Sequence, residues 1–205
     1  MSVYISPKGD FFMFTGIITH LGKVSEITNK SLVIQATRNL LSKISKGTSI
    51  SINGICLTVI DTNKHSFKID FMPETKIRTN IKYLQPDDLV NLELPLAPTD
   101  FMSGHIVQGH VDTVAKLTNI TKQGISRTLK FSIPDKFSKY MVAKGSVAVN
   151  GISLTVTETG KDRFTVAIIP YTWTNTMLHT IKKNDFVNIE VDILAKYVEK
   201  LTERL

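Results

Sequence analysis

Cysteine is almost absent from this chain of 205 residues. The single cysteine, Cys56, excludes an internal disulfide and suits a reducing compartment. It also excludes a zinc site of the cysteine-rich kind, and the sequence shows no other cluster of metal ligands. We therefore expect no metal ion and no disulfide.

Long hydrophobic runs are also missing. No apolar stretch approaches the roughly 18 residues that cross a membrane. Within residues 1–12, Pro7, Lys8, Gly9 and Asp10 interrupt any signal-peptide core, and Met13 is an equally good start. We expect a cytoplasmic protein with no membrane partner.

Charge of one sign is in excess but not concentrated. The net charge is +7, from 25 basic and 18 acidic residues, and the longest basic run is Lys182-Lys183. Aromatic residues make up only 8% and do not alternate with basic ones, as a single-strand-binding surface would require. A tandem oligonucleotide-binding barrel is therefore disfavoured, and we expect no nucleic-acid partner.

The chain contains a long internal repeat. Asn53–Val59 (NGICLTV) returns as Asn150–Val156 (NGISLTV), a shift of 97 residues. The same shift relates Asp88–Glu93 to Asp185–Glu190, and Pro73-Glu74-Thr75 to Pro170-Tyr171-Thr172. A period of this length is that of a small domain. The predicted units are an extension over 1–12, barrels over 13–100 and 101–191, and a helix over 192–205.

Strand signals dominate both copies. They cover Leu32–Ala36, Ser49–Ile60, Ser66–Met72 and Leu89–Leu96, then Thr128–Ile133, Ser146–Thr157, Arg163–Ile169 and Phe186–Ile193. Short helical patterns at Arg38–Ser45 and Asp135–Ala143 precede Lys-Gly pairs whose glycines suit helix ends. The Asn-Gly pairs indicate tight turns or bulges with positive φ. So many short strands in under 100 residues favour a small closed barrel.

The C-terminus has a different pattern. Leu194, Tyr197, Val198, Leu201 and Leu205 follow the spacing of an amphipathic helix, and Asp192 is a suitable N-cap. The first copy has no such helix. Its apolar stripe is expected to pack on the barrels or against other subunits.

The combination of motifs resembles the riboflavin synthase family of the α-chain type, from about Met13 to Leu205. It comprises Met13–Ile18 (MFTGII), both Asn-Gly-x-x-Leu-Thr-Val runs, and the pairs Gly104-His105 and Gly109-His110. The resemblance implies a mainly β fold of two similar six-stranded antiparallel barrels in tandem plus a C-terminal α-helix. It also implies a homotrimer.

The resemblance further implies an activity. Two molecules of 6,7-dimethyl-8-ribityllumazine would exchange a four-carbon unit, giving riboflavin and 5-amino-6-ribitylaminouracil without any cofactor. The alternative is a non-catalytic lumazine- or flavin-binding paralogue, which should have lost one pocket, whereas both Leu-Thr-Val walls stand here. The sequence leaves open an association with lumazine synthase.

The resemblance also implies which residues bind substrate. In the first copy these are Gly16, Ile17, Ile18, Cys56, Leu57, Thr58, Asp70, Phe71, Met72, Pro73, Glu74 and Thr75. In the second copy they are Gly109, His110, Val111, Lys144, Ser153, Leu154, Thr155, Ala167, Ile168, Ile169, Pro170, Tyr171 and Thr172.

The candidate catalytic residues are His110, Ser153, Asp192, Cys56 and Ser49. Asp192 aligns with Pro95 and His110 with Ile17, so each copy has different titratable groups. Two similar pockets with different titratable groups could hold the same molecule in two roles. Because Ser153 replaces Cys56, a shared hydrogen-bonding role is favoured over thiol chemistry. Leu57 and Leu154 are expected in the core of their strands whatever the function.

Overall fold

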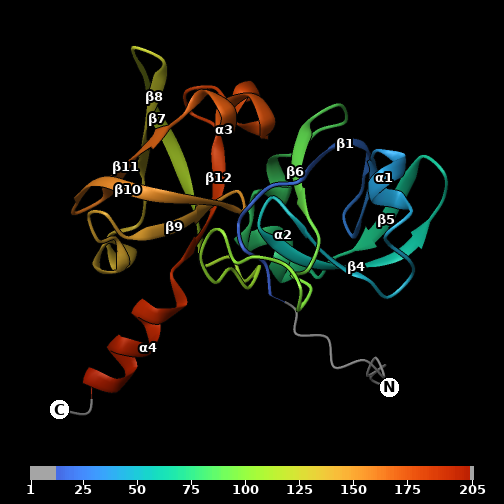
Figure 1. Ribbon diagram of the computed structural model, residues 1–205, viewed down its shortest axis with the longest axis horizontal. Helices are drawn as coiled ribbons and strands as arrows, with labels where there is room; N and C mark the ends of the chain where they lie inside the picture. Colours follow the sequence, from blue (N-terminus) through green and yellow to red (C-terminus); the bar gives the residue numbers. More distant parts are fainter. Residues whose placement is uncertain (1–12, 204–205) are drawn as a thin grey trace.

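The computed structural model describes residues 13–203. Two closed β-barrels lie side by side, and the C-terminal helix α4 (Ile193–Thr202) extends away from them (Figure 1). The expected fold class is confirmed. The extension over residues 1–12 lies outside the described residues, as does Leu205.

The first barrel is built from six antiparallel strands in the cyclic order β1-β2-β5-β4-β3-β6. They are β1 (His20–Ile27), β2 (Ser31–Gln35), β3 (Ser49–Ile52), β4 (Ile55–Thr62), β5 (Ser66–Asp70) and β6 (Leu89–Glu93). Helix α1 (Arg38–Leu41), helix α2 (Pro73–Arg78) and the 3-10 turn η1 (Asn80–Tyr83) fill the connections.

The second barrel repeats this order with six further strands. They are β7 (Thr113–Gln123), β8 (Ser126–Ser132), β9 (Ser146–Val149), β10 (Ile152–Gly160), β11 (Arg163–Ile168) and β12 (Phe186–Val191). The connections hold η2 (Asp135–Tyr140), α3 (Pro170–Asn175) and η3 (Met177–Thr180). Closure leaves neither barrel with a free sheet edge.

The predicted strands differ from the observed ones in two respects. The first strand of each barrel, β1 and β7, was not predicted, because much of each strand is polar and only partly buried. Each long stretch predicted as one strand around an Asn-Gly pair forms two strands in the structure, and the Asn-Gly pair is the turn that joins them. Asn53 and Gly54 have φ of 47° and 76°, and Asn150 and Gly151 have 45° and 77°. Two consecutive positive φ values make the tight hairpin turn that Asn-Gly favours.

The predicted helices are shorter than the sequence indicates. Arg38–Ser45 contains only the four-residue α1, and Asp135–Ala143 contains the 3-10 turn η2. Gly47 has the expected positive φ of 94°, but in the second copy Lys144 takes this role at 67° in place of Gly145.

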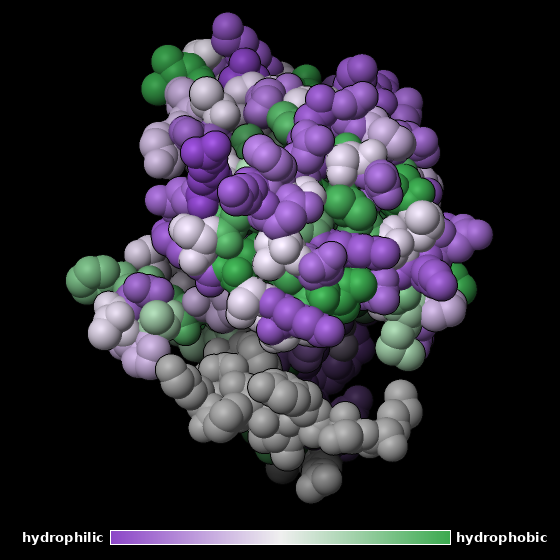
Figure 2. Space-filling model, turned by 90° about the vertical axis from the view of Figure 1, so that its right-hand side faces the viewer, coloured by the Kyte–Doolittle hydropathy of each residue, from purple (hydrophilic) through white to green (hydrophobic). Residues whose placement is uncertain are grey.

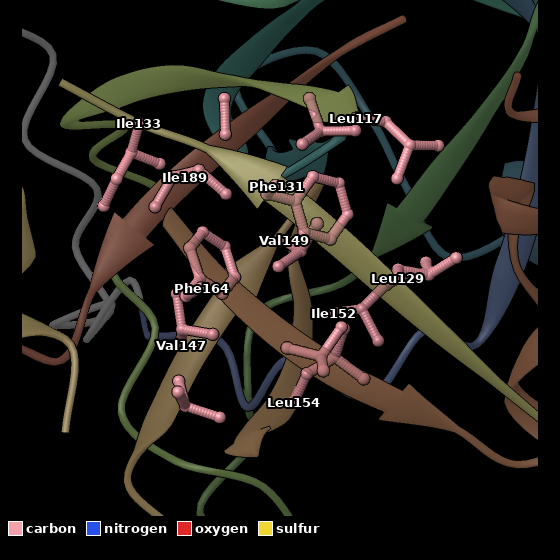
Figure 3. Packing of buried hydrophobic residues seen from close by; sticks show 14 of the residues in the cluster. Leu117, Leu129, Phe131, Ile133, Val147, Val149, Ile152, Leu154, Phe164 and Ile189 are labelled. Atoms are coloured by element: carbon pink, nitrogen blue, oxygen red, sulfur yellow. The ribbon is translucent and has the colours of Figure 1, made fainter. Parts of the chain in front are cut away.

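Each barrel has its own hydrophobic core. In the second barrel, Phe131 and Phe164 stack at a centroid distance of 5.2 Å, and aliphatic side chains from the surrounding strands enclose them (Figure 3). At roughly 1.5–3 kcal/mol for each large apolar side chain buried, these cores are the main source of stability. They also hold the strand ends, which carry the candidate site.

Buried asparagines join the two barrels. The Nδ2 group of Asn91 donates to the carbonyl of Asn150 at 2.9 Å, and Asn188 donates to the carbonyl of Asn53 at 2.8 Å. The two asparagines of each barrel are also hydrogen-bonded to each other. The backbone N–H of Asn91 donates to Oδ1 of Asn53, and the backbone N–H of Asn188 donates to Oδ1 of Asn150. The two hairpin turns meet here, with Gly54 against Gly151. The barrels are therefore held in one fixed relation about a pseudo-twofold axis.

The surface of the first-barrel end is mostly hydrophilic, with small, separated hydrophobic areas (Figure 2). Within residues 13–203, no helix combines the length and apolar character needed to span a membrane.

Candidate functional site

The two repeated motifs lie on equivalent pairs of antiparallel strands, which we call the walls. In the first barrel, Ser49 on β3 pairs with Thr58 on β4, with Cys56 two residues before Thr58. In the second barrel, Ser146 pairs with Thr155 on β10, and Ser153 occupies the position of Cys56. The structure thus brings Ser49, Cys56 and Thr58 together on two adjacent strands. Burial raises the pKa of the Cys56 thiol, and a hydrogen bond with Ser49 opposes this rise.

The segments that precede the two barrels cross between them. Phe14 and Val107 are both fully buried and pair as an antiparallel bridge. Beyond this bridge, the backbone N–H of Ser153 donates to the carbonyl of Gly16 at 2.8 Å. In the same way, the N–H of Cys56 donates to the carbonyl of Gly109 at 2.9 Å. We call residues 14–18 and 107–111 the crossing segments.

Side-chain packing follows the same exchange. Ile18 packs against the core of the second barrel, and Val111 packs against the core of the first. The sequence predicts that each crossing segment lies against the wall of its own copy. In the structure, each crossing segment instead lies against the wall of the other barrel. The bridge between Phe14 and Val107 produces this exchange, because it places both segments between the barrels.

The contact leaves no space for a side chain at either glycine. Gly16 has a φ of +77°, and a Cβ atom there would lie 2.6 Å from the backbone nitrogen of Ser153. Gly109 has a φ of +78°, and its Cβ atom would lie 2.7 Å from the backbone nitrogen of Cys56. Both glycines are therefore required by conformation and by close approach.

Two buried glutamates hold the crossing segments. Glu93 accepts hydrogen bonds from the Thr15 N–H at 2.7 Å, the Thr15 hydroxyl at 2.8 Å and the Gly16 N–H at 3.1 Å. Burial raises the pKa of Glu93 to about 7, although these hydrogen bonds lower it. Burial likewise raises the pKa of its counterpart, Glu190. Neither glutamate is among the residues predicted from the sequence, although a glutamate at the same position of a buried strand in both copies was a usable signal.

A histidine outside the predicted set contacts Ser153. The Nδ1 atom of His105 lies 2.7 Å from the Ser153 Oγ atom, and its buried Nε2 atom has no hydrogen-bond partner among residues 13–203. Burial lowers the pKa of His105, whereas the nearby charge of Asp192 raises it. The Gly104-His105 pair was part of the family resemblance, but spacing alone did not show that this side chain reaches Ser153.

Asp192 and His110 occupy different environments. Asp192 is half-buried, and its Oδ1 atom accepts a hydrogen bond from the Leu194 N–H at 3.0 Å, which makes it the N-cap of α4. The side chain of His110 is exposed, and its backbone N–H donates to Glu190 at 3.0 Å. Thus Asp192 lies near the Ser153 wall, and the crossing segment places His110 next to the Cys56 wall.

Most of the remaining predicted residues lie at the ends of β5 and β11, which adjoin β4 and β10 in the barrels. The prolines Pro73 and Pro170 begin the short helices α2 and α3 there. Met72 and Tyr171 are 67% and 74% exposed, so apolar surface is available beside each wall. Lys144 is exposed in the turn before β9, and its N–H donates to the carbonyl of Val156.

A cleft of about 630 Å³ between the barrels includes no residue of the predicted site. Tyr83 and Phe186 stack at its edge. Among residues 13–203, no group of three or more histidine, cysteine or acidic side chains could hold a metal ion.

Comparison with known proteins agrees with this organisation. The lumazine binding domain family matches residues 15–95 and again residues 108–192. The chain is 40% identical to riboflavin synthase of Photobacterium phosphoreum over 193 residues, which cover 92% of this chain and 88% of that protein. It is 36% identical to riboflavin synthase of Schizosaccharomyces pombe, over 93% and 94% of the two chains.

The chain belongs to the riboflavin synthase family. It is an enzyme of that type, as the sequence resemblance predicted. The chain shares its fold with LumP, whose structure in complex with riboflavin gives a TM-score of 0.82 at 23% identity. That match covers 87% of this chain and 99% of LumP. At this identity the match with LumP supports the fold alone.

Proposed function

We propose that the chain converts two molecules of 6,7-dimethyl-8-ribityllumazine into riboflavin and 5-amino-6-ribitylaminouracil. The observation that carries the proposal is that both repeats keep their walls, each completed by a crossing segment from the other barrel. Two identical substrates need two similar pockets held in a fixed relation. The two products together contain the atoms of two lumazines, so the transfer requires no external oxidant or reductant.

The reaction requires mainly positioning and proton transfer. One lumazine loses a proton from its C7 methyl group, and the delocalised ring system stabilises the resulting anion. The second lumazine accepts a nucleophile at C7 and then condenses with this carbanion. We assign proton handling or nucleophile activation to His110, Ser153 and Asp192.

The two walls hold the rings and ribityl chains in this proposal. Ser49, Cys56 and Thr58 serve one substrate, and Thr155 with Ser153 serves the other. Thr58 and Thr155 are exposed on their strands, so their hydroxyl groups are accessible to a ligand. Thr75 and Thr172, in the first turns of α2 and α3, provide a further hydroxyl beside each wall.

The activity has a direct test. Purified protein supplied only with 6,7-dimethyl-8-ribityllumazine should form riboflavin, and a chelator should not change the rate. Riboflavin absorbance follows the product, and chromatography should detect one 5-amino-6-ribitylaminouracil for each riboflavin. Folded protein that binds lumazine but forms no riboflavin at saturating substrate would support the non-catalytic paralogue instead.

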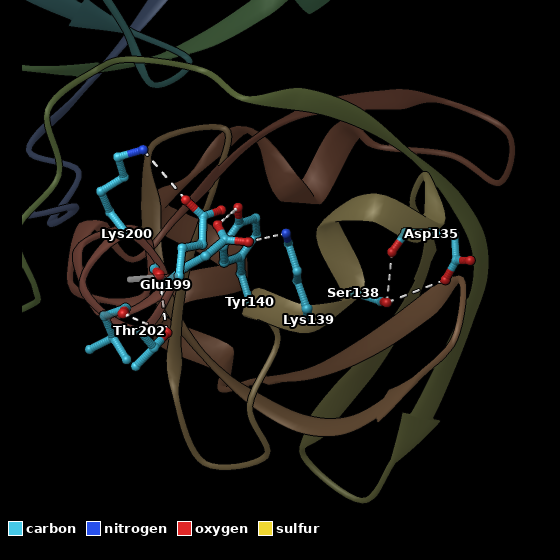
Figure 4. A network of polar contacts seen from close by, with 9 residues as sticks. Asp135, Ser138, Lys139, Tyr140, Glu199, Lys200 and Thr202 are labelled. Atoms are coloured by element: carbon cyan, nitrogen blue, oxygen red, sulfur yellow. Dashed lines mark hydrogen bonds and ion pairs between the residues drawn. The ribbon is translucent and has the colours of Figure 1, made fainter. Parts of the chain in front are cut away.

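We further propose that the protein is a homotrimer joined through α4. Leu194, Val198 and Leu201 are 59%, 59% and 70% exposed, which leaves the apolar stripe of this helix uncovered by its own barrels. One face of α4 is anchored, because Glu199 bonds with Lys139 and Tyr140 of η2 (Figure 4). Lys196 also pairs with Asp112 at 2.7 Å. The helix is thus held in place with its apolar stripe outward, as a subunit contact requires.

Shortening or charging this helix should separate the subunits. Deletion of the residues after Ala195, or the double change Val198→Glu and Leu201→Glu, is expected to yield monomers in sedimentation experiments. A charge buried in an apolar contact is costly, whereas the exposed Lys200→Glu change is the matched control and should leave the assembly intact. A trimer that survives both the deletion and the double change would show that the barrels alone hold it together.

We place the protein in the cytoplasm. The proposal is supported by the single, half-buried Cys56, which suits a reducing compartment.

A further inference from the structure

Two buried glutamates occupy equivalent positions in the two copies. Glu93 ends β6 and Glu190 lies near the end of β12, with exposures of 4% and 3%. Within residues 13–203, neither carboxylate forms an ion pair at salt-bridge distance. Burial of an unpaired carboxylate is costly unless hydrogen bonds satisfy it. The presence of a buried, unpaired glutamate in both copies therefore has to be explained by the groups that surround each carboxylate.

The donors to both carboxylates come from the crossing segments. Glu93 accepts from Thr15 and Gly16, as described above. Glu190 accepts from the N–H groups of Gln108, Gly109 and His110 at 2.6, 2.9 and 3.0 Å. Glu93 thus fixes two consecutive backbone N–H groups and Glu190 fixes three, each in the segment that leads into its own barrel.

The same segments are bound at their other side by the opposite barrel. The Gly16 carbonyl accepts from Ser153, and the Gly109 carbonyl accepts from Cys56. A continuous chain of hydrogen bonds therefore runs from Glu93 through Gly16 to Ser153, and another from Glu190 through Gly109 to Cys56. Each glutamate is connected to the pocket wall of the barrel to which it does not belong.

We propose that Glu93 and Glu190 are positioning residues for riboflavin formation, each orienting one crossing segment so that it completes the wall of the opposite barrel. This inference rests on the proposed function and adds to it. Glu190 also accepts a hydrogen bond from the backbone N–H of His110, so it fixes the position of the backbone that carries this candidate catalytic side chain. Neither glutamate contacts the proposed substrates directly, and both act through the segments that they hold.

The chemistry requires a carboxylate at these positions. Both oxygens of each glutamate accept hydrogen bonds, and all the partners are donors. A glutamine has nearly the same shape, but its NH₂ group would face a backbone N–H, so one acceptor is replaced by a donor. Glu93→Gln and Glu190→Gln therefore loosen the segments with little change in volume.

The test is backbone amide hydrogen exchange at Ser153 and Cys56, followed by NMR in the full-length protein. Glu93→Gln should speed exchange at Ser153 about tenfold and leave Cys56 unchanged, because only the Gly16 contact is loosened. Glu190→Gln should do the reverse. Turnover should fall about tenfold or more in each variant, with a smaller change in lumazine affinity. Each variant is the matched control for the other.

A milder change guards against failure to fold. Thr15→Ala removes the hydroxyl donor to Glu93 and should speed exchange at Ser153 alone. Equal loss of protection at both amides, or normal turnover in both glutamine variants, would overturn the positioning role. The proposed function has a separate test, because it would be wrong if the unmodified chain formed no riboflavin. In that case the exchange pattern would still show whether the glutamates hold the crossing segments.

Discussion

Gly16→Ala and Gly109→Ala should each reduce riboflavin formation by about a hundredfold or more, since a displacement of about 1 Å in a positioning element can have this effect. The added Cβ atom would overlap the backbone of Ser153 in one variant and of Cys56 in the other. Backbone atoms cannot rotate away, so the crossing segment must move from the wall. Steady-state kinetics with lumazine as the only substrate would measure the loss.

Gly124→Ala is the matched control for both variants. Gly124 also has a positive φ, of +59°, but a Cβ atom there meets nothing within 4 Å. Alanine in this conformation costs roughly 1–2 kcal/mol at any of the three positions. The control should therefore lose some stability and keep its turnover. If all three variants kept similar turnover, the crossing segments would not belong to the site.

Asp192→Asn should lower turnover about a hundredfold, the scale of a lost proton-transfer group. Asparagine caps helices as well as aspartate does, so this change keeps α4 and removes only the charge. Asp192→Ala removes both the cap and the charge. Comparing the two variants by riboflavin absorbance, with lumazine affinity from fluorescence, separates the chemical role from the structural one.

The two outcomes are readily told apart. If Asp192→Asn retained normal turnover while Asp192→Ala lost helix content or assembly, the carboxylate would serve only as the N-cap of α4. The proposed division of roles between the barrels rests mainly on Asp192, because the first copy has Pro95 and no carboxylate at the equivalent position. That division would then lose its main support.

Much of the fold could be predicted from the sequence because the duplication exposes it. The repeated Asn-Gly pairs mark the two hairpin turns, and the spacing from Leu194 to Leu201 marks α4. Strands β1 and β7 escaped prediction because they are only partly buried and carry many polar residues, which weakens the hydrophobic signal.

The equivalence of residues in the two copies was predictable, but their grouping in space was not. Position in a repeat indicates that Gly16 and Gly109 are equivalent, yet it carries no information on which barrel each one contacts. That exchange depends on the long-range bridge between Phe14 and Val107. The contact between His105 and Ser153 is likewise a product of folding, since the two residues are far apart in the chain.

The asparagine contacts between the barrels bear on the ancestry of the chain. Asn53 and Asn91 on one side correspond to Asn150 and Asn188 on the other, and each side donates to the other through the same atoms. Such a contact is self-complementary, as in a twofold-symmetric dimer. A single-barrel ancestor could therefore have paired with a second copy of itself through the same bonds. Gene fusion would then have joined partners that already fitted, and the two halves were free to diverge at positions such as Pro95 and Asp192.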